Sequence, residues 1–180
     1  MRDITNEVEF RTLLEKFIAH GGVLDYFMFE VPTERQGEEV HRDAAIFAMT
    51  IICSQHEYHG DPLNQCGELI DLETFWGLDD FELKQDAEYV RCAVNVDGYK
   101  SAFFCPPYDL RGTIADIELL FDSINRHVLG DGSTLPEIYS WSTDWSSYFD
   151  AGHEWWGAFY WTIRPAELPY IVMIGASTTD

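Results

Sequence analysis

The chain has 180 residues and a formal net charge of -21, because 32 Asp and Glu face only 11 Lys and Arg. This balance excludes two classes of function. Binding to nucleic acid and binding to an anionic membrane both need clustered Lys and Arg, which the sequence lacks. The composition is 46% hydrophobic and 15% aromatic, which is typical of a globular protein. We therefore predict a single domain over residues 1–180 that binds a cationic partner, with a basic protein favoured.

The first part of the chain is expected to contain one helix and two strands. Asn6 can cap a helix, and the apolar residues after it recur at helical spacing until a glycine pair, which predicts a helix over 6–20. Residues 23–31 are rich in apolar and aromatic side chains and are predicted as a strand that leads into a polar loop. Residues 44–53 are almost uniformly apolar, and their length favours a buried strand over a helix.

An acidic stretch follows, from residue 43 to residue 83, which contains no Lys or Arg. Apolar residues are threaded through its second half, whereas a disordered acidic tail would lack them because it has nothing to bury. After a loop over 56–65, the stretch is therefore predicted to fold as a short helix and a turn around Gly77, with its carboxylates held on the surface.

Two further patterns lie between residues 87 and 130. Residues 87–96 and 99–105 are predicted to pair as a hairpin, because the dipeptide Asp-Gly lies between them at 97–98. A helix is predicted over 113–129, where Thr113 can cap the first turn and the apolar residues form one stripe.

The last part of the chain is turn-rich and aromatic over 131–152, and the two apolar segments 155–163 and 170–174 are predicted as strands. Taken together, the elements predict an α+β fold. We expect one domain with a mostly antiparallel sheet and two main helices, 6–20 and 113–129.

The four cysteines, at positions 53, 66, 92 and 105, are expected to be buried thiols. The N-terminal residues lack the apolar run of a signal peptide, so the expected compartment is the cytoplasm, where disulfides are rare.

One local pattern offers metal ligands. Cys53, His56, His59 and Cys66 follow the spacing C-x2-H-x2-H-x6-C, and two thiolates with two imidazoles suit zinc. The spacing is not one of the usual zinc-binding patterns, and we favour two loop histidines and two core cysteines, with no metal and no other cofactor. The alternative function is a small cytoplasmic enzyme that is metal-dependent through residues 53–66.

No catalytic residue is predicted from the sequence. The motifs G-x-S-x-G, G-x-x-x-x-G-K-[ST] and G-x-G-x-x-G after a strand are absent. The dipeptide His153-Glu154 lacks the second histidine of H-E-x-x-H, and adjacent residues of a strand point to opposite faces.

The acidic residues favour binding to a basic protein. Acids at i,i+4 on a helix lie about 5–6 Å apart, and alternate residues of a strand lie about 6.6 Å apart. The phosphates of one DNA strand are spaced by about 3.4 Å. A folded acidic surface can therefore occupy a protein surface that binds nucleic acid, and aromatic anchors can prolong the complex. The predicted partner-binding residues are Glu68, Asp71, Glu73, Asp79, Asp80, Glu82, Asp86, Glu88, Glu118, Asp122, Asp144, Asp150 and Trp145.

In charge and size, the chain resembles phage or plasmid inhibitors of restriction and CRISPR nucleases, and immunity proteins that neutralise nuclease toxins. This resemblance implies an inhibitor of a nucleic-acid-processing protein, and no sequence motif extends it to a family. One contiguous negative face would favour the inhibitor and candidate nucleic-acid mimic, whereas an even scatter would favour acidity that serves solubility alone. The aromatic residues between 141 and 161 favour a hydrophobic core, with a partner interface as the alternative.

Overall fold

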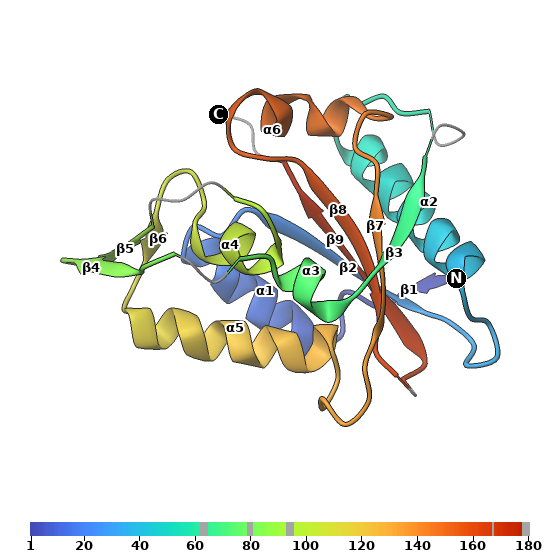
Figure 1. Cartoon of the computed structure of the whole chain (residues 1–180), viewed down its shortest axis with the longest axis horizontal. Coiled ribbons are helices and arrows are strands. Elements are labelled where there is room, and N and C mark those ends of the chain that lie inside the picture. Colours follow the sequence, from blue (N-terminus) through green and yellow to red (C-terminus); the bar gives the residue numbers. More distant parts are fainter. Residues whose placement is uncertain (62–64, 79–80, 93–95, 167, 178–180) are drawn as a thin grey trace.

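The architecture is an antiparallel sheet with helices packed on both faces (Figure 1). The computed structural model describes residues 1–61, 65–78, 81–92, 96–166 and 168–177, and every element below belongs to these residues. Within them six strands form the main sheet, in the order β1-β2-β9-β8-β7-β3. The strands are β1 (Arg2–Asp3), β2 (Leu24–Glu30), β3 (Gly67–Ile70), β7 (Glu137–Trp141), β8 (Phe159–Arg164) and β9 (Tyr170–Ala176). The predicted α+β fold with an antiparallel sheet is confirmed.

One face of the sheet carries both of the long helices that the sequence predicts. The helices of this layer are α1 (Val8–Ala19), α3 (Leu72–Trp76), α4 (Tyr99–Phe104) and α5 (Ile114–Val128). Aromatic rings hold the layer together: the ring centroids of Phe17 and Phe103 lie 4.4 Å apart, and those of Phe75 and Tyr99 lie 4.8 Å apart. Stacked rings in a buried core stabilise beyond their burial alone, and here they fix α4 against α1 and α3.

The opposite face is covered by α2 (Glu38–Gln55), and the short helix η2 (Ser147–Phe149) leads into α6 (Asp150–Trp155). The strand predicted over 44–53 is wrong, because this segment is the middle of α2. Its apolar run continues a helical pattern that begins with Val40 and His41, and every buried position of α2 fits that period. The alanines of the run let α2 approach the sheet closely.

A small second sheet lies near the N-terminal end of α5, at the left of Figure 1. It consists of β4 (Lys84–Asp86), β5 (Tyr89–Arg91) and β6 (Leu110–Arg111). A disulfide joins Cys92, just after β5, to Cys105 at the end of α4. The expectation that all four cysteines are thiols is therefore wrong for this pair, which the fold brings together across 13 residues. Cys53 and Cys66 are free, and Cys66 is exposed rather than in the core.

The predicted hairpin over 87–105 is also wrong, because its second half forms α4. Asp97 accepts hydrogen bonds from the Leu78 backbone N–H at 3.2 Å and the Ser101 hydroxyl at 3.2 Å. Gly98 packs so closely on Gly77 that a Cβ at residue 98 would lie 2.7 Å from the Gly77 backbone. The Asp-Gly dipeptide therefore starts α4 and docks it on the end of α3, instead of turning between two strands.

The remaining boundaries agree closely with the sequence prediction in most places. The strands β2 and β9, the helices α1 and α5, and the short helix before Gly77 all lie where the sequence predicts them. Strand β7 was missed inside the turn-rich segment, and β8 begins at Phe159 rather than at residue 155. Among the described residues, no helix combines the length and apolar character that a membrane crossing needs.

Candidate partner-binding groove and a buried polar network

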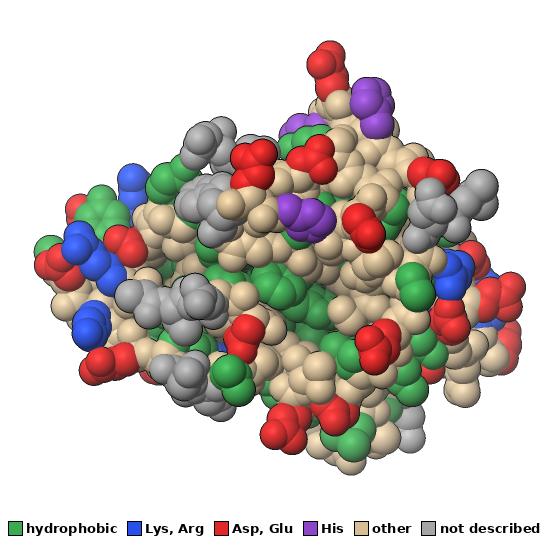
Figure 2. Space-filling model, turned by 45° about the horizontal axis from the view of Figure 1, so that its top comes forward, with side chains coloured by type: hydrophobic (Ala, Val, Ile, Leu, Met, Phe, Trp, Pro, Cys, Tyr) green, Lys and Arg blue, Asp and Glu red, His purple; other side chains and the backbone are tan. Residues whose placement is uncertain are grey.

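The predicted partner-binding acids are distributed over several elements of the fold. They fall on four parts of the fold: β3 and α3 (Glu68, Asp71, Glu73), the small sheet (Asp86, Glu88), the flank of α5 (Glu82, Glu118, Asp122), and the region around η2 and α6 (Asp144, Asp150). Asp79 and Asp80 lie outside the described residues. Figure 2 shows acidic side chains scattered over the visible face, around a hollow in which hydrophobic side chains are exposed. This scatter argues against mimicry of a nucleic-acid backbone by that whole face.

The flank of α5 is the place where predicted acids come together around a cavity. Glu82, Glu118 and Asp122 line an open groove of about 790 Å³ between α5, α4 and the segment before β4. The other lining residues are Phe81, Leu83, Lys100, Phe104, Ile114 and Phe121. The lining thus combines five apolar residues with three acids and one lysine. We call this cavity the α5 groove, its apolar residues the floor and its three acids the rim.

A second cavity, of about 430 Å³, extends the α5 groove along the same helix. The two cavities share Lys100, Phe121 and Asp122, and the second continues past Trp76 and Arg126 to the loop after α5. An extended segment or a helix of a partner could therefore contact most of the length of α5.

Local sequence explains why this flank is built as it is. The Thr113 side chain caps α5 by accepting a hydrogen bond from the Asp116 backbone N–H at 3.1 Å, as the sequence predicts. The apolar stripe buries Ile117 and Phe121 against the core. Glu118 and Asp122, at i and i+4, remain exposed beside that stripe, and within the described part of the chain neither of them forms an ion pair. Their charge is therefore not neutralised by a neighbouring base.

Three of the predicted acids, one of them from the α5 groove, have hydrogen bonds or ion pairs within the chain. Asp71 caps α3 by accepting from the Thr74 backbone N–H at 2.8 Å, and this bond lowers the pKa of the Asp71 carboxyl. The Asp86 carboxylate lies 3.2 Å from the Arg91 guanidinium, and Glu82 lies 3.6 Å from Lys84.

Trp145, the aromatic residue of the predicted set, is a core residue. Its side chain is 6% exposed, and its indole N–H donates to the Ser142 carbonyl at 2.6 Å. It packs in the hydrophobic core under α2, so it is not available as a surface anchor.

The four candidate metal ligands are not gathered into a site. No group of three or more metal-ligating side chains occurs among the residues that the structure describes. Cys53 lies on α2 beside a cavity of about 420 Å³ that His59 also lines. Burial raises the pKa of the Cys53 thiol, which makes it a poor metal ligand or nucleophile at neutral pH.

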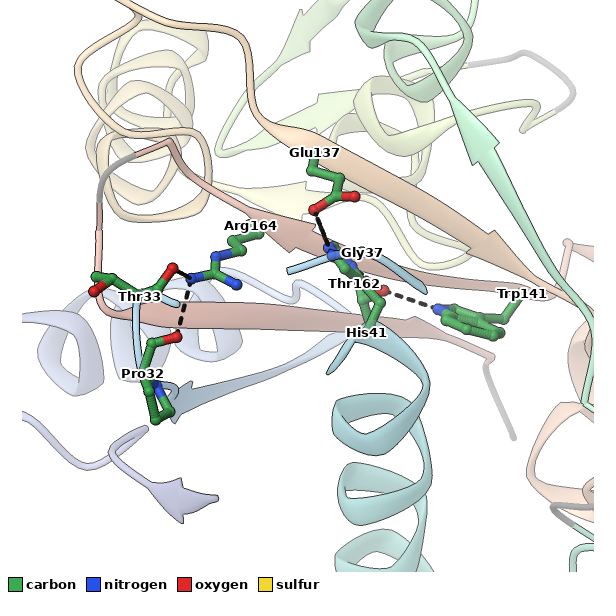
Figure 3. A network of polar contacts seen from close by, with 8 residues as sticks. All are labelled: Pro32, Thr33, Gly37, His41, Glu137, Trp141, Thr162 and Arg164. Atoms are coloured by element: carbon green, nitrogen blue, oxygen red, sulfur yellow. Dashed lines mark hydrogen bonds and ion pairs between the residues drawn. The ribbon is translucent and has the colours of Figure 1, made fainter. Parts of the chain in front are cut away.

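A buried polar network that the sequence did not reveal connects α2 to the sheet (Figure 3). Nδ1 of His41 lies 2.8 Å from Oγ1 of Thr162, and the Trp141 indole N–H donates to the same oxygen at 2.9 Å. Nε2 of His41 lies 3.3 Å from Oε2 of Glu137. Both His41 and Thr162 are 0% exposed. No local motif signals this network, because His41 and Thr162 are 121 residues apart in the chain.

Hydrogen-bonding logic assigns one tautomer to His41. If Nε2 carries the proton toward the Glu137 carboxylate, Nδ1 accepts from the Thr162 hydroxyl, which in turn accepts from Trp141. Burial lowers the pKa of His41 to about 4, against the opposing effect of Glu137, so the ring is neutral at pH 7.

This order of carboxylate, imidazole and hydroxyl also occurs in hydrolases, where the hydroxyl is the nucleophile. Here the Thr162 hydroxyl is buried and already has two partners, so it cannot meet a substrate. We therefore interpret the network as structural.

Comparisons of the chain with protein-family models, with curated proteins and with solved structures found no match. Its function is therefore argued from its own geometry.

Proposed function

We propose that the chain is a protein-binding inhibitor or adaptor, and that the α5 groove holds a basic segment of its partner. The observation that carries the proposal is the meeting of Glu82, Glu118 and Asp122 around an apolar floor. A partner segment with apolar residues flanked by Lys or Arg would fill the floor and pair with the rim.

The two parts of the groove have different energetic roles. Exposed ion pairs contribute only about 0.2–1 kcal/mol each, so the rim mainly steers the encounter and selects a basic partner. Burial of the parts of Phe81 and Leu83 that are still exposed adds to the affinity. The net charge of -21 adds a long-range attraction that salt screens.

A nucleic-acid-processing protein is the proposed partner class, because such proteins present Lys and Arg to bind phosphates. The scatter of acids outside the groove supports contact through a limited surface, rather than imitation of a continuous phosphate backbone. This confines the inhibitor proposal to the groove and its surroundings.

The cytoplasmic location stays a prediction from the sequence. The disulfide between Cys92 and Cys105 argues for an oxidising compartment, because disulfides seldom persist in the cytoplasm. Alkylation with and without prior reduction distinguishes the two compartments, because Cys53 and Cys66 are free in either case.

The proposal is tested by capture from a lysate of the native host with a tagged form of this chain. Bound proteins are eluted first at about 50 mM salt and then at about 200 mM salt, a range over which surface charge interactions weaken strongly. We expect a nucleic-acid-binding protein that is retained at the lower salt and released at the higher. Retention of no protein, or of proteins that salt does not release, would contradict the proposal.

A further inference from the structure

A buried arginine without an acidic partner lies in the main sheet. Arg164, at the end of β8, is 7% exposed. Its Nη2 donates to the carbonyl oxygens of Pro32 and Thr33 at 3.2 Å each, and its Nη1 has no hydrogen-bond partner (Figure 3). Among the described residues, no carboxylate lies within 4.0 Å of this guanidinium.

The missing partner is unexpected because an acid is directly opposite. Glu137 on β7 pairs in register with Arg164 on β8. Cross-strand residues of opposite charge normally attract each other, yet the Glu137 carboxylate turns to the Gly37 backbone N–H at 3.4 Å and to His41. Opposite charges on neighbouring strands are thus held apart instead of neutralising each other.

A cavity of about 560 Å³ is lined by both of these side chains. The rest of its lining is Thr33, Gln36, Leu135, Pro165, Ala166 and Leu168, so most of the wall is apolar. Small-molecule sites commonly have this composition, with apolar walls and a few polar groups that orient the ligand. A buried charge normally needs a counter-charge, and this chain offers the Arg164 guanidinium none in direct contact.

We propose that this cavity binds a small apolar α-amino acid, whose carboxylate pairs with Arg164 and whose ammonium pairs with Glu137. Arginine is well suited to a carboxylate because its planar donors can bind both oxygens. The neighbouring Glu137 disfavours a dianion such as phosphate and favours a ligand that also carries a positive group. The wall formed by Leu135, Pro165 and Leu168 suits an aliphatic or thioether side chain.

The contacts within the chain leave one oxygen of Glu137 and one nitrogen of Arg164 without a hydrogen-bond partner. The hydrogen bond of Gly37 and the approach of His41 both involve Oε2 of Glu137. Within the described residues, no hydrogen bond or ion pair engages its other oxygen, Oε1. Nη1 of Arg164 is covered in this conformation, so the guanidinium must rotate slightly to reach a carboxylate. The two bonds that resist this rotation are at the long end of the hydrogen-bond range.

The test is a titration of the ¹⁵N-labelled chain followed by amide chemical shifts, with the L forms of valine, leucine, isoleucine, methionine and phenylalanine as probes. The comparison compounds are 4-methylpentanoate, which lacks the amino group of leucine, 3-methylbutylamine, which lacks its carboxylate, and inorganic phosphate. We expect at least one amino acid to cause saturable shifts at Gly37, Glu137 and Ala166, with a dissociation constant below about 1 mM.

Variants separate the proposed roles from general damage. Glu137→Gln should weaken amino-acid binding by at least about tenfold, whereas the affinity for 4-methylpentanoate should not fall, because the variant removes a negative charge that repels this anion. The matched control Glu154→Gln, on the exposed part of α6, should change neither. Arg164→Lys should weaken the amino acid and 4-methylpentanoate together, and its folding is checked from the same spectra.

Three outcomes would overturn the proposal. The first is that none of the five amino acids gives saturable shifts around the cavity. The second is that 4-methylpentanoate, 3-methylbutylamine or phosphate binds as well as the amino acid. The third is that Glu137→Gln, with its fold intact, binds the amino acid as tightly as the original chain.

Discussion

Nδ1 of His41 on α2 lies 2.8 Å from Oγ1 of Thr162 on β8, and this contact joins α2 to the main sheet. The Trp141 indole shares the same hydroxyl. One threonine side chain therefore satisfies the polar groups of two buried residues.

The first prediction concerns this hydroxyl. Thr162→Val keeps the shape of the side chain but leaves the Trp141 N–H and the His41 Nδ1 without partners. A buried unsatisfied group costs about 1–3 kcal/mol, so we expect the free energy of unfolding to fall by about 2–4 kcal/mol. Urea titration monitored by tryptophan fluorescence measures the change. Thr162→Ser, which keeps the hydroxyl, should cost about 1 kcal/mol, and equal losses in the two variants would contradict the role of the hydrogen bonds.

The second prediction concerns the pH dependence of stability. The folded pKa of His41 is about 4, below its ordinary value of 6.5, so the unfolded chain binds a proton more readily than the folded chain. The stabilisation is fully present above about pH 6.5 and is lost as the pH falls toward about 4. Since each pKa unit corresponds to about 1.36 kcal/mol, the loss should reach about 3 kcal/mol.

The check on His41 compares the free energy of unfolding at pH 7 and at pH 4.5 in the original chain and in His41→Asn. The asparagine can bond to Thr162 but does not titrate. The variant should have a shallower pH dependence between these values. If both proteins lose the same free energy, another group is responsible for the acid sensitivity.

The third prediction concerns the disulfide. The bond closes the loop from Cys92 to Cys105, which includes α4. In the chain-entropy model, a disulfide that closes a loop of this size stabilises the fold by about 3 kcal/mol. Replacing Cys92 and Cys105 together by serine should lower the free energy of unfolding by about 2–4 kcal/mol. Cys66→Ser, at an exposed free thiol, is the matched control and should be near neutral.

Alkylation of the chain isolated from its native host, followed by mass analysis, reports whether the bond exists there. We expect labelling of Cys53 and Cys66 without prior reduction, and of Cys92 and Cys105 only after reduction. Labelling of all four without reduction would contradict the disulfide and would favour the cytoplasmic prediction.

Much of the fold follows from local signals in the sequence. The helix α5 was predicted because its cap, Thr113, and its apolar stripe are both local features. The segment 44–53 was misassigned because a short apolar run fits a strand and a buried helix equally well. Val40 and His41, which precede the run at helical spacing from Ala44 and Ala45, identify α2.

Contacts between distant segments account for the other errors. The Asp-Gly dipeptide at 97–98 is a strong hairpin signal, but the close approach of Gly98 to Gly77 gives the two residues another role. The same reason limits the prediction of sites. The sequence identified Glu82, Glu118 and Asp122 as acids that could bind a partner, but only the packing of α5 places them around one groove. Nothing local connects Arg164 with Glu137.

The α5 groove is the centre of the functional account, and charge reversal within it tests that account most directly. Two tagged forms of the chain are compared in the capture experiment: Glu118→Lys with Asp122→Lys in the groove, and Glu34→Lys with Glu154→Lys at exposed acids outside it. Both pairs change the net charge equally, so only the position differs. We predict that the groove variant retains at least about tenfold less of the basic partner, which corresponds to about 1.4 kcal/mol, while the control retains it. Equal retention by the two variants would contradict binding through the groove.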